Sequence, residues 1–412
     1  MKQLIVISSY PPFGSTHHHQ VVGVATYTKN TLKALSQSYS PEERPKITVL
    51  AEVLSESESQ YEEDGITVKR VWRRKSLTSF WQLFKAIRKT KTKDVVFELE
   101  LAMFGGIIHL LPLPLFLLYL KFTGRKTTIV AHQIITSVAD VHGQLNLPEK
   151  GFKPTLLTFL LRLFYRIILL FSSQVIVFDE YLKGQLGKFG SPEKIVVIPH
   201  GIETFTDLPT QKEAKTKLNL PQDRPILLYF GFLAWYKGTD ILLDAYAKLP
   251  EKNRPVLVIA GGPNPNHTDK KFYQDYIESL TKKAESEGAI ITGFVPEELI
   301  PYYFAASDVC ILPYRTFMSS SGPLSFVFAA HKPFLLSHRL KPVFATEDIA
   351  AIIRELGISE DELTFTTQTD LEEKITELLS NTSLQKNVSE LDLRLVNSRK
   401  WSEIGKRYRD AL

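Results

Sequence analysis

The residues best suited to chemistry lie in a short glycine-bounded loop that holds one lysine. The loop spans residues 229–238, follows an apolar strand-like run and precedes the apolar-periodic stretch 239–247. Gly231 and Gly238 permit a close approach between the backbone and a ligand. Amides at the start of the next helix and the Lys237 ammonium would then face a negative group, most simply a diphosphate. The same pattern also fits an ordinary turn with an exposed lysine, so the residues that follow must decide.

A second candidate for phosphate binding lies further along the chain, at residues 319–324. Gly322 permits close approach at the start of a predicted helix that contains Leu324. The hydroxyls of Ser320 and Ser321 add hydrogen-bond donors to the helix amides. This stretch therefore has the composition of a second phosphate cradle.

These pieces occur in the order found in a known family. The lysine loop is followed by residues 255–262, 289–306, 307–314 and 325–336. In order and wording, the segment resembles the nucleotide-binding domain of the GT-B glycosyltransferases of family 4, and the resemblance covers most of the chain. It implies an α/β fold of two Rossmann-like doubly wound domains that face a central cleft. It also implies transfer of a sugar from a nucleotide-diphosphate-sugar to an acceptor hydroxyl.

The resemblance assigns roles to residues of the second half. Lys237 matches the lysine that contacts the donor diphosphate, and residues 320–324 occupy the place where helix amides bind phosphate. Stabilising the leaving diphosphate is the main electrostatic task in such a reaction, so Lys237 is a candidate catalytic residue. The loops that surround the nucleoside in the family correspond to Gly261, Gly262, Phe294 and Val295.

The chain departs from the family in its charged residues. The family's partner arginine usually precedes the lysine, but Phe232 and Ala234 occupy the candidate positions, and Arg315 is predicted to substitute. The common family form also carries two glutamates, of which the second holds the ribose hydroxyls. Those positions fall near Met318 and at Phe326. The departures leave open a non-catalytic relative that acts as a partner subunit or a sugar-binding module.

The first half of the chain is predicted to alternate strands and helices. The intervening helical patterns are long enough for crossovers, which favours a parallel doubly wound sheet. Ligands of such sheets bind at the carboxyl ends of the strands, so the residues there should form one wall of the cleft. The strand candidates are 3–8, 47–50, 94–97, 127–131 and 174–178, and the rim candidates are 11–23, 98–106, 132 and 179–180.

Four residues of this wall are candidates for contact with the reacting sugars. His132 follows the strand 127–131, as the family's histidine in the sugar-proximal site does, and its imidazole could bind a sugar hydroxyl or act near the anomeric carbon. Gly23 matches the first loop that approaches the donor phosphate. Glu98 and Glu100 follow a strand as acceptor-side candidates, and the period of two means that a glutamate there faces the cleft while its neighbour does not.

A run of three histidines raises the question of a metal site. His17, His18 and His19 are consecutive on a loop, point in different directions and lack useful ligand spacing. GT-B enzymes generally need no divalent cation. We therefore expect no metal and no other cofactor, with the nucleotide-sugar as co-substrate, and we assign His19 to contact with the acceptor.

Length and patterning indicate two domains. A chain of 412 residues suits two cores, and residues 202–223 are polar and turn-rich. We place an N-terminal acceptor-side domain at 1–200 and a C-terminal nucleotide-sugar-binding domain at 201–398. By the resemblance, a helix at 399–412 crosses back to complete the first domain.

Composition narrows the classes of partner. Hydrophobic residues make up 44% and charged residues 23%, which is typical of a globular protein. The single cysteine, Cys310, permits no internal disulfide and fits a reducing compartment, so we expect a cytoplasmic protein. The net charge of +5 suits an anionic ligand or membrane surface, and without a basic patch interleaved with aromatics it does not indicate nucleic acid.

Two apolar segments bear on membrane contact. Residues 107–120 are interrupted by two prolines, and residues 156–171 carry Arg162 and Arg166 on one helical face. Both fall short of the roughly 20 uninterrupted apolar residues of a membrane span. Helices packed on a sheet are the favoured interpretation. Peripheral attachment at the inner face of the cytoplasmic membrane, with arginines at the lipid headgroups, stays open.

The sequence therefore predicts a glycosyltransferase of the hexosyltransferase type, acting in glycan, glycolipid or polysaccharide synthesis. The resemblance implies retention at the anomeric carbon, with the leaving phosphate oxygen taking the acceptor proton, so that positioning and diphosphate stabilisation carry the catalysis. Another GT-B enzyme, such as a nucleotide-sugar epimerase or a sugar phosphorylase, is an alternative. The non-catalytic relative is a second alternative. Convergence of His132, Lys237 and Gly322 on one open cleft would favour the enzyme.

Overall fold

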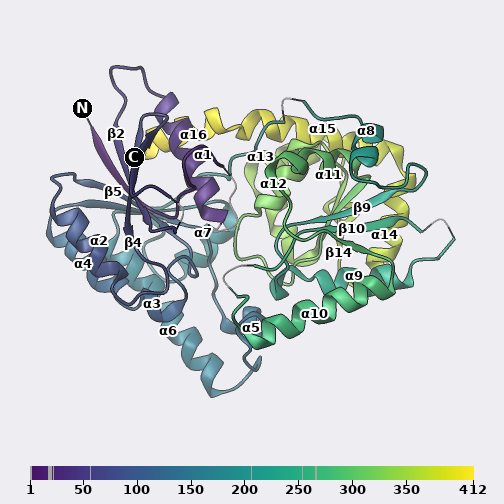
Figure 1. Cartoon of the computed structure of the whole chain (residues 1–412), viewed down its shortest axis with the longest axis horizontal. Helices are drawn as coiled ribbons and strands as arrows, with labels where there is room; N and C mark the ends of the chain where they lie inside the picture. Colours follow the sequence, from purple (N-terminus) through teal and green to yellow (C-terminus); the bar gives the residue numbers. More distant parts are fainter. Residues whose placement is uncertain are drawn as a thin grey trace.

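The chain folds into two α/β halves, each built on its own sheet, which lie side by side (Figure 1). The computed structural model describes residues 2–16, 21, 23–55, 57–205, 207–252, 254–264 and 267–412. All but one pair of neighbouring strands run parallel in both sheets. The predicted α/β class with doubly wound parallel sheets is therefore confirmed.

The sheet of the first half has eight strands in the order β3-β4-β2-β1-β5-β6-β7-β8. The hairpin at its edge was not predicted. Its strands are antiparallel, and its turn places Asp64 at a φ of 53° and Gly65 at 77°, as a tight Asp-Gly hairpin requires. The strands are β1 (Gln3–Ile7), β2 (Lys46–Glu52), β3 (Gln60–Glu63), β4 (Ile66–Trp72), β5 (Asp94–Leu99), β6 (Lys126–Ala131), β7 (Gln174–Val177) and β8 (Ile195–Val197).

Helices cover both faces of this sheet because strand side chains alternate between the faces. In β1, Leu4 and Val6 pack into the core beneath α1 and α16, whereas Ile5 and Ile7 pack into the core beneath the other helices. The first layer consists of α1 (Gly23–Gln37) and α16 (Trp401–Ala411). The second consists of α2 (Ser79–Arg88), α3 (Ile107–Leu110), α4 (Leu113–Phe122), α6 (Phe152–Phe171) and α7 (Glu180–Gly187).

The second half contains a fully parallel six-stranded sheet in the order β11-β10-β9-β12-β13-β14. Its strands are β9 (Ile226–Phe230), β10 (Val256–Ala260), β11 (Ile290–Ile291), β12 (Val309–Leu312), β13 (Phe334–Ser337) and β14 (Thr364–Phe365). Its helices are α8 (Gln211–Lys217), α9 (Thr239–Lys248), α10 (Lys271–Ser286), α11 (Ile300–Ala306), α12 (Gly322–Ala329), α13 (Glu347–Leu356), α14 (Gln368–Ser380) and α15 (Thr382–Arg399). A short helix α5 (His142–Leu145) and the 3-10 turn η3 (Trp235–Lys237) meet between the halves.

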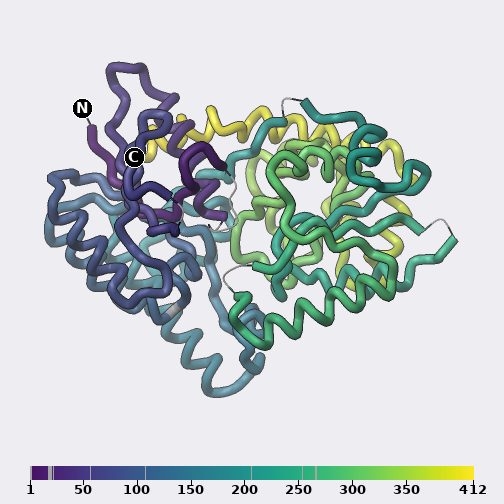
Figure 2. The backbone as a smooth tube through the Cα atoms, viewed as in Figure 1, coloured from purple at the N-terminus to yellow at the C-terminus, as the bar shows by residue number. Residues whose placement is uncertain are grey.

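The end of the chain returns to the first half, as the tube in Figure 2 shows. Lys400 takes an extended conformation between α15 and α16 and forms a bridge with Ile202. The α16 helix then packs against α1, where the hydroxyls of Tyr27 and Tyr408 are 2.6 Å apart. Gly405 permits this packing, because a Cβ there would lie 2.4 Å from the Ala34 backbone. The predicted return of the C-terminal helix is confirmed.

Candidate functional site

A cavity of about 340 Å³ lies between the two halves and is lined by residues from both. His132 lines it from the end of β6, Lys237 lines it from η3, and Gly322 lines it from the start of α12. The three residues that were expected to converge thus meet at one open cleft. Because the carboxyl ends of both sheets contribute to its walls, the cleft occupies the usual ligand position of parallel α/β sheets.

Lys237 is a buried ammonium, and no carboxylate in the described part of the chain pairs with it. Lys237 is 7% exposed, and burial alone lowers its pKa to about 8. Its Nζ lies 5.6 Å from the centroid of the Tyr314 ring. Gly231 has a φ of 125°, and a Cβ there would fall 2.8 Å from Nζ and 3.1 Å from the Pro323 ring, so glycine suits this position. Gly238 is needed as well, since its φ is 68° and a Cβ would meet the Pro313 carbonyl at 2.0 Å. An anion in the cleft would supply the missing charge.

The start of α12 forms the wall beside the lysine. Ser320 and Gly322 line the cleft. Ser321 is instead the N-cap of the helix: its hydroxyl accepts a hydrogen bond from the Leu324 amide at 3.2 Å and lies 3.1 Å from the Tyr314 hydroxyl. Leu324 is buried in the core. Of the predicted phosphate-binding stretch, Ser321 and Leu324 therefore do not line the cleft, and both residues hold the helix in place.

Arg315 does not provide the second positive charge that the sequence predicts. Its guanidinium donates to Asp240 at 2.8 Å and to the Trp235 carbonyl at 2.7 Å, and it lies 4.7 Å from the centroid of the Trp235 ring. It does not line the cleft. Since Asp240 neutralises its charge, Arg315 stabilises the turn that presents Lys237 instead of binding the donor.

His132 is held by a buried carboxylate. Its Nε2 lies 2.7 Å from Oε2 of Glu98, which is 1% exposed, and its amide donates to the Leu99 carbonyl at 2.9 Å. Because the carboxylate accepts, Nε2 carries the proton of this bond, and Nδ1 is the ring nitrogen that Glu98 leaves to a ligand. The predicted acceptor contact of Glu98 is wrong: β5 extends to Leu99, so Glu98 still lies within the strand and orients the histidine.

Glu100 lies in the turn after β5 and does line the cleft. Its Oε2 is buried with no hydrogen-bond partner among the described residues, and burial raises its pKa. A buried carboxyl with an unused oxygen can exchange a hydrogen bond with a hydroxyl of a bound sugar. Gly23 opens α1 on the same side of the cleft, and a Cβ there would meet no protein atom.

The predicted nucleoside loops line the cleft from the second half, and their side chains there are apolar. Gly261, Gly262, Phe294 and Val295 all line it, together with Phe326. A Cβ on Gly261 would lie 1.9 Å from the Gly231 carbonyl oxygen, so this glycine keeps two strand-end loops in contact. Phe326 stacks on Phe304 with ring centroids 5.8 Å apart and leaves the cavity open. An aromatic platform thus stands where the resemblance places a carboxylate.

Several cleft residues escaped the sequence reasoning. His200 follows β8, so the rule of carboxyl ends would have found it; burial lowers its pKa to about 4, which keeps it neutral. Glu203 accepts hydrogen bonds from Asn30 at 3.0 Å and from the Trp401 indole at 2.9 Å. Asn30 lies on α1, Glu203 in the connection between the halves, and Trp401 on α16. No local pattern in the sequence predicts such a cluster.

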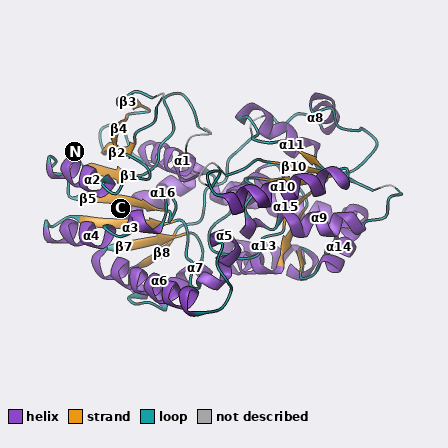
Figure 3. Cartoon of the chain, turned by 60° about the horizontal axis from the view of Figure 1, so that its bottom comes forward, coloured by secondary structure: helices purple, strands orange, loops and turns teal. Residues whose placement is uncertain are grey.

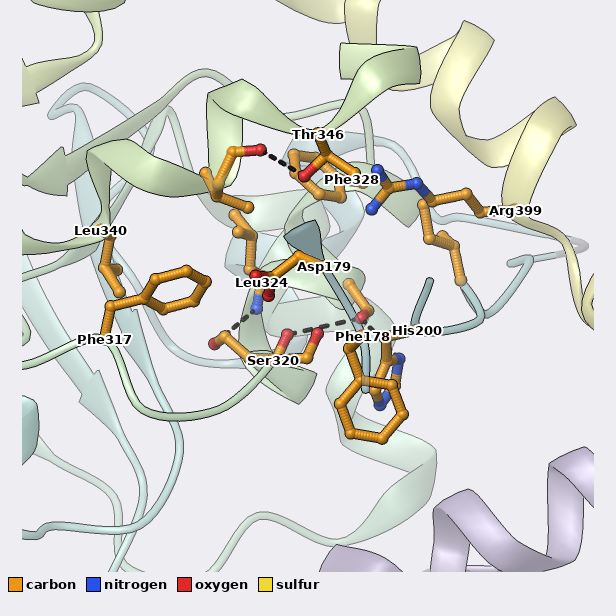
Figure 4. Close-up of a pocket in the computed structure, with 14 residues that line it drawn as sticks. Phe178, Asp179, His200, Phe317, Ser320, Leu324, Phe328, Leu340, Thr346 and Arg399 are labelled. Atoms are coloured by element: carbon orange, nitrogen blue, oxygen red, sulfur yellow. Dashed lines mark hydrogen bonds between the residues drawn. The ribbon is translucent and has the colours of Figure 1, made fainter. Parts of the chain in front are cut away.

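A second, much smaller cavity of about 30 Å³ lies behind the start of α12 (Figure 4). It has room for water but not for a substrate. Asp179 lines it and caps α7 by accepting from the Leu182 amide at 2.8 Å, and burial raises the pKa of Asp179 to about 6. Asp179 was expected on the cleft rim, and the structure turns it to this inner cavity.

In the parts of the chain that the structure describes, no group of three His, Cys, Asp or Glu side chains could hold a metal ion. The predicted acceptor contact at His19, and its neighbours His17 and His18, lie outside the described residues.

A sequence comparison with protein families finds a match in the second half of the chain. The sequence model of the family described as glycosyl transferases group 1 matches residues 210–329. The chain is 27% identical over 130 residues to a D-inositol 3-phosphate glycosyltransferase of Kineococcus radiotolerans, which covers 30% of this chain and 29% of that protein. It is 26% identical over 146 residues to the lipopolysaccharide 1,2-N-acetylglucosaminetransferase of Salmonella typhimurium, and this stretch covers 34% of this chain and 38% of that protein. The matched stretch thus spans about a third of these curated relatives.

Solved structures resemble the whole chain. Sucrose-phosphate synthase from Thermosynechococcus elongatus has a TM-score of 0.72 at 17% identity and covers 100% of this chain and 98% of its own. Anabaena HepE in complex with UDP and glucose has a TM-score of 0.68 at 15% identity, and the match covers 100% of this chain and 99% of HepE. WaaG, a glycosyltransferase involved in lipopolysaccharide biosynthesis, has a TM-score of 0.64 at 15% identity, covering 99% of both chains. At these identities the likeness shows the GT-B fold, as expected.

Proposed function

We propose that this chain, whose residues 210–329 belong to the glycosyl transferases group 1 family, transfers a sugar from a nucleotide-diphosphate-sugar to an acceptor hydroxyl. The observation that carries the proposal is the buried, uncompensated ammonium of Lys237 in a cleft shared by both halves. An unpaired buried charge is costly, and a bound diphosphate would remove that cost. In this proposal, residues 1–200 with 399–412 hold the acceptor and residues 201–398 hold the donor.

The diphosphate lies between Lys237 and the start of α12. The ammonium provides a point charge, and the Gly322 amide and the Ser320 hydroxyl, which line the cleft, provide hydrogen bonds at the positive end of the helix dipole. As the bond between the anomeric carbon and the diphosphate oxygen breaks, the electron pair goes to the diphosphate, where these groups stabilise it. No divalent cation and no other cofactor is required, because the protein supplies the positive charge.

The acceptor side is built around the Glu98–His132 pair. Glu98 fixes the imidazole, so that Nδ1 can bind a hydroxyl of the transferred sugar near the anomeric carbon. Glu100, which lines the same wall, is placed to bind a hydroxyl of the acceptor. The acceptor oxygen bonds to the anomeric carbon with retention, and its proton goes to the leaving phosphate oxygen. Retention requires no separate carboxylate base.

The nucleoside lies against the apolar side chains that line the cleft from the second half. Gly261 and Gly262 bring the backbone close to the base, and Phe294 and Phe326 provide aromatic surface for it. Anabaena HepE, which shares the fold, binds UDP and UDP-glucose, and this supports a nucleotide donor. The relatives named for lipopolysaccharide synthesis support a glycan or lipid-linked acceptor. The protein would then act in the cytoplasm, next to the inner face of the cytoplasmic membrane.

The open cleft favours the transferase over a non-catalytic relative. Two bulky side chains near the site leave it open: Phe326 lies in the wall of the cleft, and Trp235 packs against Gly143 and does not line it. A degenerate partner subunit would not be expected to keep an unpaired lysine buried at an open site. The alternative of an epimerase or phosphorylase on the same fold has no comparable observation in its favour.

A nucleotide panel tests the proposal. Thermal unfolding would be followed with UDP, GDP, ADP and their common sugar conjugates in the presence of a chelator. One nucleotide should raise the melting temperature of the wild type and fail to do so in Lys237→Ala, because a ligand of the native state stabilises it. The exposed Lys282, which pairs with Glu278 on α10, provides the matched control in Lys282→Ala. If none of the nucleotides shifts the wild type, the protein is a non-catalytic relative.

A further inference from the structure

One helix of the first half presents a long apolar stripe to solvent. Along α6, exposed side chains recur at the spacing of one helical face: Phe152, Leu156, Phe159, Leu163 and Leu170. Phe152 is 84% exposed and Phe159 is 62% exposed. The opposite face packs into the core through Tyr165, Ile168 and Leu169. The stripe is therefore the outer side of an anchored helix.

Neighbouring helices continue the apolar surface. The α4 helix packs between α2 and α6, and Figure 3 shows these helices together on the outside of the first sheet. The exposed side chains of this layer are Leu77, Trp81, Ile108, Leu111, Leu115, Phe122, Phe152, Leu156, Phe159, Leu160, Leu163 and Leu170. They are twelve of the eighteen large apolar side chains exposed in the described residues, so the exposure is concentrated in the helices of this layer and the turns that flank them. We call it the apolar layer. A patch of this kind marks an interaction site.

The segment of the chain that carries the apolar layer is rich in basic residues. Residues 66–178 contain seventeen Lys and Arg against five Asp and Glu, a net charge of +12, whereas the whole chain has +5. Residues 66–93 contain no acidic residue at all. Arg162 and Arg166 run along the flank of the stripe on α6, and Lys153 lies at its start. Basic residues beside an exposed apolar helix face are the pattern of binding to an anionic lipid surface.

The fold excludes a membrane-spanning role for α6. By length and composition the helix could cross a bilayer, and only 22% of its most apolar window is buried. However, α6 connects β6 to β7, which are paired neighbours in one sheet. Both ends of the helix are thus tied to the same side of the same domain. The helix can lie in the plane of a membrane surface, but it cannot pass through the membrane with the sheet intact.

A second copy of the chain is a poor match for the same surface. A symmetric dimer would place two apolar layers face to face, because each copy contributes the same patch. The basic residues around the two patches would then approach one another, which is unfavourable. An anionic bilayer instead offers apolar tails for the stripe and negative headgroups for its flanks.

We propose that the apolar layer docks the protein on the surface of an anionic lipid bilayer. The α6 helix lies in the interface with its stripe among the acyl chains and Arg162 and Arg166 at the headgroups. Phe122 and Leu115 on α4 insert beside it, and Trp81 on α2 lies at the interfacial depth that tryptophan favours. This inference does not rest on the reaction proposed above.

Docking would bring the cleft close to the lipid. The segment after His132 leads into α5, where His142 packs on Trp235 at 4.7 Å and Gln144 accepts from the Trp235 amide at 3.1 Å. The α6 helix begins a few residues later, at Phe152. One continuous segment thus lines the cleft, touches the lysine turn and enters the membrane surface.

Vesicle flotation with the full chain tests the proposal. The wild type should float with vesicles that contain phosphatidylglycerol, and about tenfold less with pure phosphatidylcholine or at high salt, because screening weakens the contacts to headgroups. The double variant Phe159→Glu with Leu163→Glu should lose about tenfold or more of its binding to both kinds of vesicle. Arg162→Gln with Arg166→Gln should lose only the preference for anionic lipid.

Controls separate docking from misfolding and from self-association. Leu393 is an exposed leucine on α15, far from the apolar layer, and Leu393→Glu should float like the wild type. All the substituted positions are exposed, and unchanged melting temperatures would establish that the variants fold. If the wild type does not float, or if Leu393→Glu lowers flotation as much as the α6 variant, the proposal is overturned. A wild-type dimer in light scattering that becomes monomeric in the α6 variant, without vesicle binding, would identify a dimer interface instead.

Discussion

Replacing Lys237 by methionine should stabilise the unliganded protein while weakening its binding of nucleotide diphosphates. Burial lowers the pKa of the ammonium from 10.5 to about 8 without a compensating charge. At pH 7 the folded protein carries a charge that its surroundings disfavour. Methionine fills a similar volume without charge, so the cost disappears.

The size of the effect follows from the pKa shift. At about 1.4 kcal/mol for each pKa unit, the charged lysine costs the folded state about 3 kcal/mol at pH 7. This is an upper limit, because water enters the open cleft. Between the folded and unfolded pKa values the unfolded chain binds more protons, so the wild type gains stability from about pH 8 to 10.5. The advantage of Lys237→Met should therefore fall to less than half by pH 9.5.

Calorimetry at pH 7 and pH 9.5 measures this difference, and titration with a nucleoside diphosphate measures the cost in binding. A hydrogen bond to a charged group contributes about 1.5–3 kcal/mol, so affinity should fall by roughly 10-fold to 150-fold in the variant. The reasoning is refuted if Lys237→Met is less stable than the wild type at pH 7. It is also refuted if the stability difference does not change with pH, since the ammonium would then have a counter-charge.

Three further outcomes are expected. Nucleotide affinity of the wild type should be nearly constant between about pH 7 and 8, where the terminal phosphate keeps its charge, and should fall above pH 8 as Lys237 loses its proton. Isothermal titration from pH 7 upward measures the decline, and a flat profile would show that the ammonium does not bind the diphosphate. Glu98→Gln should lower kcat with little change in KM for the donor, because the amide no longer fixes the imidazole as a carboxylate does. Assays of released nucleoside diphosphate test this, and an unchanged kcat would show that the pair does not position a group for the reaction. Gly261→Ala should destabilise the fold by several kcal/mol, because its Cβ would collide with the Gly231 carbonyl. Gly184→Ala, in the middle of α7 where a Cβ meets no neighbour, should instead stabilise the fold by up to about 1 kcal/mol. Denaturant unfolding distinguishes the two variants, and equal effects would mean that the loops at Gly261 can separate freely.

The strands were predictable because buried strands of parallel sheets are nearly continuous apolar runs. The pattern that ends at Ala131 and the run before Phe230 illustrate this, and the structure places both as predicted. The β3–β4 hairpin was missed because its edge strand is charged and half-exposed, although Asp64 and Gly65 carried the turn signal.

The partners of individual charged residues were less predictable, because the fold brings together residues that lie far apart in the sequence. Arg315 is paired with Asp240, which lies 75 residues earlier in the sequence. Glu98 serves His132 because β5 and β6 are neighbours in register. Lys237 and Gly322 could be predicted as cleft residues from short local patterns, because the local backbone sets their positions. Such patterns do not reveal which charges the fold has already neutralised.

The return of α16 to the first half has a consequence for the order in which the protein can be made. The strands of the first sheet are complete once β8 has been synthesised, but the face beneath α1 lacks Ile404 and Tyr408 until the second half has followed. At roughly 5–20 residues per second, the interval lasts on the order of tens of seconds. During that time an apolar groove beside α1 stands open on the nascent chain. Chaperone contact at this groove, released when α16 emerges, would protect the growing protein from aggregation.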